Sequence, residues 1–294
     1  MYTLNFLTTL LPLLLPALAL ATAPPTYKPT TISPTCLNFN DYKSLWDLAS
    51  KGTPLFHFAN YQSKYPTCWP AWPFRPDGSK RLPAAQECWP LNTKCNQPGK
   101  EGWGENMPVF WTAKQCPDKK NGHKQKEVRV SYSVFWQKDG FSDAGPGHDY
   151  DWETVIVIWR LNGQGGEYVK DEILLSGRGK FRGKCWGDVP ETVEKNDWTA
   201  CGLKNRDHAK VYVGWCEHSM FFDMGGSAAK GSCDAHGDLR GDDYWFAATT
   251  KDNLIGANPG TDHYKQFCGN DWGKAAMKPS VVYDNLCEYE ANMM

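Results

Sequence analysis

Residues 128–136 read VRVSYSVFW, an alternation of larger apolar side chains with mostly polar ones. One face of this segment carries Val128, Val130, Tyr132, Val134 and Trp136, and the other carries Arg129, Ser131 and Ser133. A period of two residues predicts a β-strand. We therefore expect a strand with one face in a hydrophobic core.

A second segment, residues 154–159, reads TVIVIW and is apolar from Val155 onward. Apolar side chains on both faces are typical of a central strand that is covered on both sides. Further strands are predicted, between glycine-rich turns, at residues 172–175, 210–213, 220–222 and 244–248.

Helices are expected to be few, because 27 glycines and 20 prolines leave few long uninterrupted stretches. One helix should begin after Asn40 or Asp41, which can cap its N-terminus, and end at Gly52. Residues 65–117 contain four cysteines and many prolines, so we expect loops there. The sequence thus predicts a mainly β fold, a β-sandwich with peripheral short helices and disulfide-stapled loops.

The overall composition favours a globular chain. Hydrophobic residues make up 41% and aromatic residues 14% of the 294 residues, enough for a core. Lys and Arg number 32 and Asp and Glu 33, so the net charge is −1. This balance excludes a general nucleic-acid-binding surface.

The N-terminus predicts secretion. Residues 5–21 are apolar and uncharged, and an A-x-A pattern occurs twice, so residues 1–23 resemble a secretory signal peptide. Residues 24–35 are rich in Pro and Thr and predict a flexible arm. Residues 36–294 are then expected to form a single domain of a secreted, extracellular and monomeric protein, with at most peripheral membrane contact.

Eleven cysteines follow the leader, so an oxidising compartment allows up to five disulfides. The wide spacing and the absence of a CxxC pair are poor for a zinc site, and the connectivity stays open. The candidates are Cys36, Cys68, Cys88, Cys95, Cys116, Cys185, Cys201, Cys216, Cys233, Cys268 and Cys287.

The segment before the central strand points to a metal. Residues 139–153 contain five carboxylates and one histidine but no lysine or arginine. Asp151 and Glu153 share one strand face, His148 precedes them, and Asp139 can fold back across a loop with three glycines. A divalent cation would relieve the repulsion, and the ligand set favours Ca²⁺, Mg²⁺ or Mn²⁺. The alternative is a solvated acidic loop.

Residues 147–153, GHDYDWE, resemble the G-H-R-H-D-W-E heptapeptide of the necrosis- and ethylene-inducing-like proteins (NLPs). Residues 132–139, YSVFWQKD, are similar to the family's Y-S-W-Y-F-P-K-D, and residues 151–159 to its D-W-E-x-V-V-V-W. Weaker similarities lie at residues 68–78 and 215–222. The chain therefore resembles the NLP family over its central part.

The resemblance implies a β-sandwich related in shape to actinoporins. It implies Ca²⁺ or Mg²⁺ at a solvent-facing cavity, and the activity of a virulence toxin or effector. Such a toxin recognises the sugar headgroup of plant glycosyl inositol phosphorylceramides, or another glycan, and disrupts the plasma membrane without covalent chemistry. The implied metal residues are Asp139, His148, Asp151 and Glu153; the implied cavity residues are His218, Tyr150 and Asp149; and Trp152 would support the site.

Two heptapeptide positions differ from the family. Asp149 replaces the arginine and Tyr150 the second histidine, so the site gains a negative charge and loses a group that can become cationic. One alternative is a non-cytolytic secreted protein of the same fold that binds glycans or aids colonisation. A further alternative is a metal-dependent hydrolase in which Glu153 or His218 transfers protons.

Overall fold

The computed structural model of the chain describes residues 30–58, 69–83, 107–120, 126–140, 147–163, 166–194, 204–214, 217–223, 244–290 and 292–293. The predicted signal peptide and residues 24–29 of the predicted arm lie outside these ranges. Within the ranges, no helix combines the length and the apolar character needed to cross a membrane.

The two segments that predict the fold lie in its longest strands. The strand β3 (Lys126–Gly140) contains residues 128–136, and β4 (Gly147–Leu161) contains residues 154–159. They pair antiparallel along their length. Residues 150–160 of β4 are all buried, and β3 and β5 flank this strand, which confirms the prediction of a central strand covered on both sides.

The described strands form two sheets. The large sheet has the order β11 (Leu254–Gly256), β2 (Val109–Pro117), β3, β4, β5 (Tyr168–Gly177), β6 (Lys180–Cys185) and β12 (Asn292–Met293). The small sheet has the order β10 (Tyr244–Ala247), β1 (Leu55–Phe58), β8 (His208–Val213) and β7 (Thr192–Val193), with β9 (Met220–Phe221) beside β8. The four shorter strand predictions fall in β5, β8, β9 and β10 and are confirmed.

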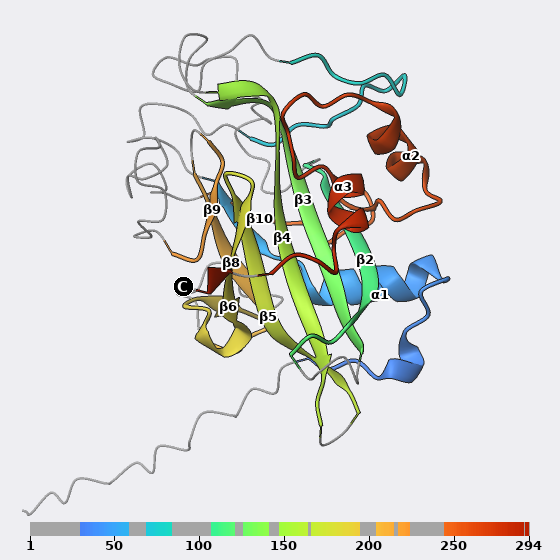
Figure 1. Ribbon diagram of the computed structural model, residues 1–294, viewed down its shortest axis with the longest axis vertical. Coiled ribbons are helices and arrows are strands. Elements are labelled where there is room, and N and C mark those ends of the chain that lie inside the picture. The colour runs from blue at the N-terminus through green and yellow to red at the C-terminus, as the bar shows by residue number, and fades with distance from the viewer. Residues whose placement is uncertain are drawn as a thin grey trace, which may run out of the picture.

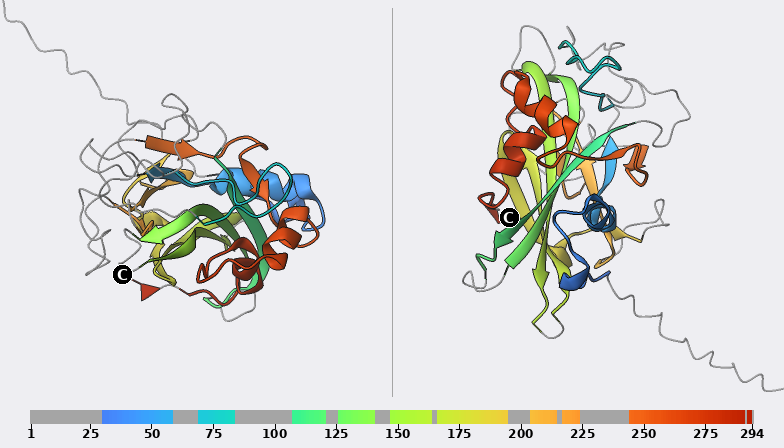
Figure 2. Two further views of the ribbon diagram at one scale, coloured as in Figure 1. Left: turned by 90° about the horizontal axis from the view of Figure 1, so that it is seen from above. Right: turned by 90° about the vertical axis from the view of Figure 1, so that its right-hand side faces the viewer.

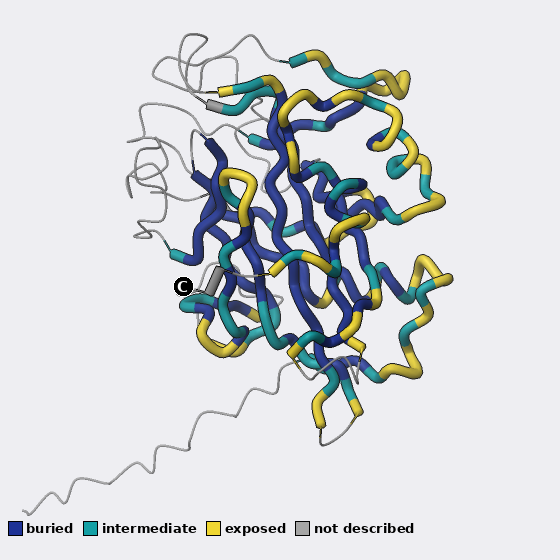
Figure 3. Tube along the Cα trace, viewed as in Figure 1, coloured by how far each residue is buried: buried dark blue, intermediate teal, exposed yellow. Residues whose placement is uncertain are grey.

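The large sheet lies between two covering layers. On one face, Val130 and Val157 share a core with Val211 of the small sheet and with the helix α1 (Tyr42–Gly52). On the other face, Ile156 packs in a second core with α2 (Asp262–Gly269) and α3 (Pro279–Asp284). Figure 1 shows α2 and α3 in front of the large sheet, and the side view in Figure 2 places α1 on the opposite side. The fold is therefore a β-sandwich with peripheral helices, as predicted, and its strands are largely buried (Figure 3).

The helix α1 begins and ends at the predicted residues. The Asp41 carboxylate accepts hydrogen bonds from the backbone N–H groups of Lys43 and Ser44, both at 3.2 Å, and so caps the helix. At its C-terminal end the backbone passes close to the sheet. A Cβ at Gly52 would lie 2.9 Å from the Tyr132 hydroxyl oxygen, so glycine is required there.

One prediction of irregular structure was wrong, and two helices were missed. Residues 109–117 form β2, which lies beside β3, although the prolines and cysteines around its apolar residues suggested a loop. The helices α2 and α3 were not predicted, because eight and six residues are too few to show a helical period. In the predicted arm, the backbone of Ile32 exchanges hydrogen bonds with that of Tyr168, so the end of this segment packs on the domain.

His263 of α2 packs in the aromatic core between the large sheet and the helices. Its ring centroid lies 6.4 Å from that of Phe74 and 5.5 Å from that of Phe110. Burial lowers the pKa of His263 below its ordinary value. The unfolded chain therefore binds a proton here at higher pH than the folded chain, and folding stability decreases as the pH falls below about 6.5.

We expect His263→Phe to weaken this acid sensitivity, because a phenyl ring packs in the same place and does not titrate. The measurement compares the urea midpoints of both proteins at about pH 7 and about pH 5, below the ordinary histidine pKa. The variant should lose less stability between the two pH values. An equal loss in both proteins would contradict the prediction.

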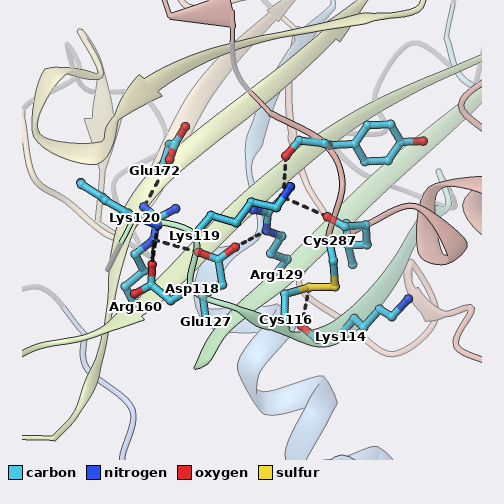
Figure 4. Close-up of polar contacts among 12 residues, drawn as sticks. Lys114, Cys116, Asp118, Lys119, Lys120, Glu127, Arg129, Arg160, Glu172 and Cys287 are labelled. Atoms are coloured by element: carbon cyan, nitrogen blue, oxygen red, sulfur yellow. Dashed lines mark hydrogen bonds and ion pairs between the residues drawn. A yellow bond between two sulfur atoms is a disulfide. The ribbon is translucent and has the colours of Figure 1, made fainter. Parts of the chain in front are cut away.

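A group of buried charges lies where β3 begins and β4 ends (Figure 4). Glu127 is fully buried, and its two carboxylate oxygens accept hydrogen bonds from Arg129 Nε at 2.5 Å and Arg160 Nε at 2.8 Å. Arg129 Nη1 also donates to the carbonyl oxygens of Leu286, at 3.0 Å, and Tyr289, at 2.5 Å. These contacts hold the segment after α3 against the large sheet.

Candidate metal site

The opposite ends of β3 and β4 bring the predicted acidic residues together. Because the strands are antiparallel, the last residues of β3 lie beside the first residues of β4, with Asp139 opposite His148. Asp151 and Glu153 follow on β4. They project from the same face of the strand as Val155, which lies in the core between the two sheets. The predicted residues therefore collect at one end of the sandwich.

His218 reaches this end from the other sheet. It lies between β8 and β9, and its Nδ1 is 2.9 Å from an Asp151 carboxylate oxygen. Its ring stacks on the indole of Trp136, with centroids 4.1 Å apart and planes at 6°. The backbone of His218 has φ +52°, a strained conformation for a side chain of this size, and such residues are frequent at functional sites.

Asp139, Asp151 and His218 form a group that could hold a metal ion. Each offers one ligand atom, and these atoms all lie within 4.8 Å of one another. Ligands of Ca²⁺ lie about 2.4 Å from the ion, so two ligands on opposite sides are about 4.8 Å apart. The three residues therefore fit one ion of that size, and Mg²⁺ would need a small contraction.

His148 lies beside this group. Its Nδ1 is 2.8 Å from the Tyr150 carbonyl oxygen, and its Nε2 is 3.4 Å from an Asp139 carboxylate oxygen. A carbonyl oxygen only accepts, so Nδ1 carries a proton and Nε2 faces Asp139. With its proton on Nδ1, the neutral ring offers a lone pair at Nε2, which suits a histidine that binds an ion through water beside Asp139.

Glu153 lies farther along the strand and is held by β5. The Ser176 hydroxyl donates a hydrogen bond to its carboxylate and accepts one from the backbone N–H of Thr154 at 2.6 Å. The Glu153 side chain is buried but borders the same cavity as Asp151. Of the four predicted metal residues, the structure thus groups Asp139 and Asp151 with His218, and places His148 and Glu153 around them.

An open cavity of about 440 Å³ adjoins the group. Four carboxylates, two cationic side chains and one histidine contribute to its wall. The lining residues are Asp139, Gly147, His148, Asp151, Trp152, Glu153, Arg178, Gly179, Glu217, Lys274, Ala276 and Met277. This volume is within the range of pockets that bind small molecules.

The other heptapeptide residues do not line this cavity. Tyr150 has φ +59°, and its ring packs 5.5 Å from that of Trp272 with Lys80 Nζ 4.6 Å above it. Asp149 is exposed and forms an ion pair with Lys138 at 3.5 Å. Both were predicted as cavity residues, as was His218, which is not a lining residue but contacts Asp151, which is. The Tyr150 ring lies in the same core as that of Trp152, two residues farther along the strand.

Trp152 packs in the aromatic core behind the site. Its ring lies 4.9 Å from Phe135, 5.2 Å from Phe267 and 5.6 Å from Trp272, measured between centroids. The side chain is 1% exposed and reaches the cavity wall. It therefore supports the strand from which Asp151 and Glu153 project.

Three charged residues of the cavity were not predicted from the sequence. Arg178, in the turn between β5 and β6, donates from Nε to a Glu217 carboxylate oxygen at 3.1 Å, and Lys274 lies between α2 and α3. Glu217 and Lys274 carry no sequence signal. Arg178 does, because an arginine between two glycines replaces the Asn-Gly that a tight hairpin prefers.

The structure describes five of the eleven cysteines. Cys116 and Cys287 form a disulfide, whereas Cys36, Cys185 and Cys268 are free thiols. The other candidates, Cys68, Cys88, Cys95, Cys201, Cys216 and Cys233, lie outside the described residues.

A scan against models of protein families, a search of curated proteins and a search of solved structures each found no match to this chain.

Proposed function

We propose that the chain is a secreted, non-enzymatic effector that uses a divalent cation to recognise glycosylated sphingolipid headgroups and disrupt plant plasma membranes. The observation that carries the proposal is the group of Asp139, Asp151 and His218, whose two carboxylates line an open cavity. The resemblance of residues 132–139 and 147–159 to the NLP family supports the choice of lipid and the lytic outcome.

The electrostatics of the cavity support a cation. Four carboxylates line it against two cationic side chains, so one divalent ion balances the formal charges of these groups. Two carboxylates and one imidazole leave coordination positions open on Ca²⁺, which takes six to eight ligands and accepts sugar hydroxyls among them. The chain's own part is to hold the ligand atoms in place, and the stacking of His218 on Trp136 fixes the ring that offers the nitrogen.

The test is dye release from vesicles that contain plant glycosyl inositol phosphorylceramides, with Ca²⁺ or Mg²⁺ and with chelator. Phosphatidylcholine vesicles are the blank. Asp151→Asn and Asp139→Asn keep the side-chain shape but remove a charged ligand, and each should reduce leakage and cation affinity by about 100-fold or more. Asp149→Asn, on an exposed neighbour outside the cavity, is the matched control and should behave like the wild type.

Calorimetric titration with Ca²⁺ and thermal unfolding with and without Ca²⁺ show whether each variant is folded and binds the ion. A bound ion should raise the thermal midpoint of the wild type and not that of Asp151→Asn. Leakage that persists in chelator, or that is equal in Asp151→Asn and the wild type, would rule out the cation mechanism.

The placement of Tyr150 favours a second candidate function. The family's second heptapeptide histidine is here a tyrosine whose ring lies in the aromatic core. A non-cytolytic glycan-binding protein would keep the cation site without the lytic step. Cation and glycan binding without leakage would identify this function, and turnover of a glycan or phosphoester would instead identify a hydrolase.

A further inference from the structure

The residue at the tip of the β5–β6 hairpin is not explained by the turn. Gly177 pairs with Lys180, so the loop consists of Arg178 and Gly179, with φ of +55° and +72°. Positive φ at both positions defines the type I′ turn, for which asparagine followed by glycine is preferred. An arginine in the first position is strained. We therefore attribute the arginine at this position to a contact that its side chain makes.

The Arg178 side chain borders the same cavity as the candidate metal group. It is half exposed, and its Nε donates to Glu217 at 3.1 Å. Among the described residues, Glu217 is the one partner of this guanidinium, so both terminal NH₂ groups remain able to bind a ligand. A guanidinium presents these donors in the planar arrangement that matches a carboxylate or a phosphate.

Lys274 is the second cationic residue of the cavity wall. It is exposed and lies in the segment between α2 and α3. The preceding Gly273 has φ +57°, and a Cβ there would lie 3.4 Å from the Asp149 carbonyl oxygen, so this segment runs close against the start of β4. Two separate segments thus place positive charge around a cavity whose other charged residues are acidic.

We propose that Arg178 and Lys274 form an anion subsite, which binds the acidic group of a sugar ligand while the sugar hydroxyls reach the cation at Asp139, Asp151 and His218. The proposal rests on the proposed function for the cation and adds the residues that bind the acidic group of the ligand. Without a cation, the four carboxylates of the cavity repel such a ligand. Cation and acidic sugar should therefore bind cooperatively, each raising the affinity for the other.

The probes are glucuronate, glucose 6-phosphate and glucose, titrated calorimetrically into the full chain with and without Ca²⁺. We expect both acidic sugars to bind about tenfold or more tightly than glucose when Ca²⁺ is present, because each adds a charge-assisted contact. The stronger of the two shows whether a carboxylate or a phosphate is the natural group. Equal affinity for glucose and both acidic sugars would overturn the proposal.

Arg178→Asn is the decisive variant, because it installs the residue that the turn prefers and should fold at least as well as the wild type. It should lower the affinity for acidic sugars by about tenfold and have a much smaller effect on glucose. Lys180→Gln, on the same hairpin but outside the cavity lining, is the matched control. Wild-type affinity for acidic sugars in Arg178→Asn would overturn the proposal.

Glu217→Gln separates ligand binding from a structural role of the ion pair. It breaks the pair, keeps the guanidinium and removes one of the repelling carboxylates, so acidic sugars should bind more tightly, and this gain should be smaller in the Arg178→Asn background if Arg178 contacts them. Weaker binding would instead assign Arg178 to holding the segment that carries His218. Titration with Ca²⁺ alone tests the proposed function independently, because an anion subsite that remains without Ca²⁺ binding would refute only the cation mechanism.

Discussion

Removal of the disulfide between Cys116 and Cys287 is expected to lower the free energy of unfolding by about 5 kcal/mol. The two cysteines are 171 residues apart, so the bond closes a long loop in the unfolded chain. Restricting such a loop removes many unfolded conformations, and the chain-entropy treatment gives a value of this size. Cys116→Ala/Cys287→Ser is the variant to make, because a single substitution would leave a thiol able to exchange with other cysteines.

Urea unfolding without reductant measures this effect. Cys36 and Cys268 are exposed and free, so Cys36→Ser/Cys268→Ser provides a control with the same number of substitutions and should stay within about 0.5 kcal/mol of the wild type. A loss of less than about 2 kcal/mol in the disulfide variant would contradict the prediction. Such a result would mean that contacts such as those of Arg129 hold the C-terminal segment without the bond.

The long strands could be predicted from the sequence because the positions of their apolar residues show which strand faces are buried. The apolar residues at 128–136 and 154–159 need to be buried, and the layers that cover the two faces of the large sheet bury them. The helices α2 and α3 could not be predicted in the same way. Each is short and is stabilised by packing on the sheet, which local sequence does not encode.

The candidate site was predictable only where its residues are close in the sequence. Asp139 and Asp151 flank one hairpin, and the repulsion in that segment indicated a cation. His218 lies 67 residues beyond Asp151, and the packing of the two sheets brings them together. Only the family resemblance indicated it. The positive φ of Tyr150 could not be predicted from the sequence, because this conformation is rare for tyrosine.

Glu127→Ala is expected to lower the free energy of unfolding by about 3–5 kcal/mol. The substitution removes a carboxylate that contacts both Arg129 and Arg160, two nearly fully buried side chains. Arg129 is left with backbone carbonyl partners alone, whereas Arg160 keeps the carboxylates of Asp118, Asp171 and Glu172. Burial by itself lowers the pKa of Arg160, but the nearby carboxylates, Glu127 first among them, raise it above its ordinary value. Arg160 therefore stays charged, and the variant must bury a guanidinium that has lost a partner.

Urea unfolding of three variants separates charge from shape. Glu127→Gln keeps the size of the side chain but removes the charge, so it should fall between the wild type and Glu127→Ala. Glu288 forms an exposed ion pair with Lys119 at 3.4 Å, and Glu288→Gln should change stability by less than about 1 kcal/mol. If Glu127→Ala changed stability as little as Glu288→Gln, burial would not be the reason for the effect.

The double variant Glu127→Ala/Arg129→Met tests whether the loss arises from an unpaired charge. If it does, removing one of the two arginines should recover part of the stability lost in Glu127→Ala, because the methionine does not need a carboxylate. The loss in the double variant would then be smaller than the sum of the two single losses. Additive losses would instead mean that Glu127 and Arg129 contribute through separate contacts, with Arg129 acting chiefly through the carbonyl oxygens of Leu286 and Tyr289.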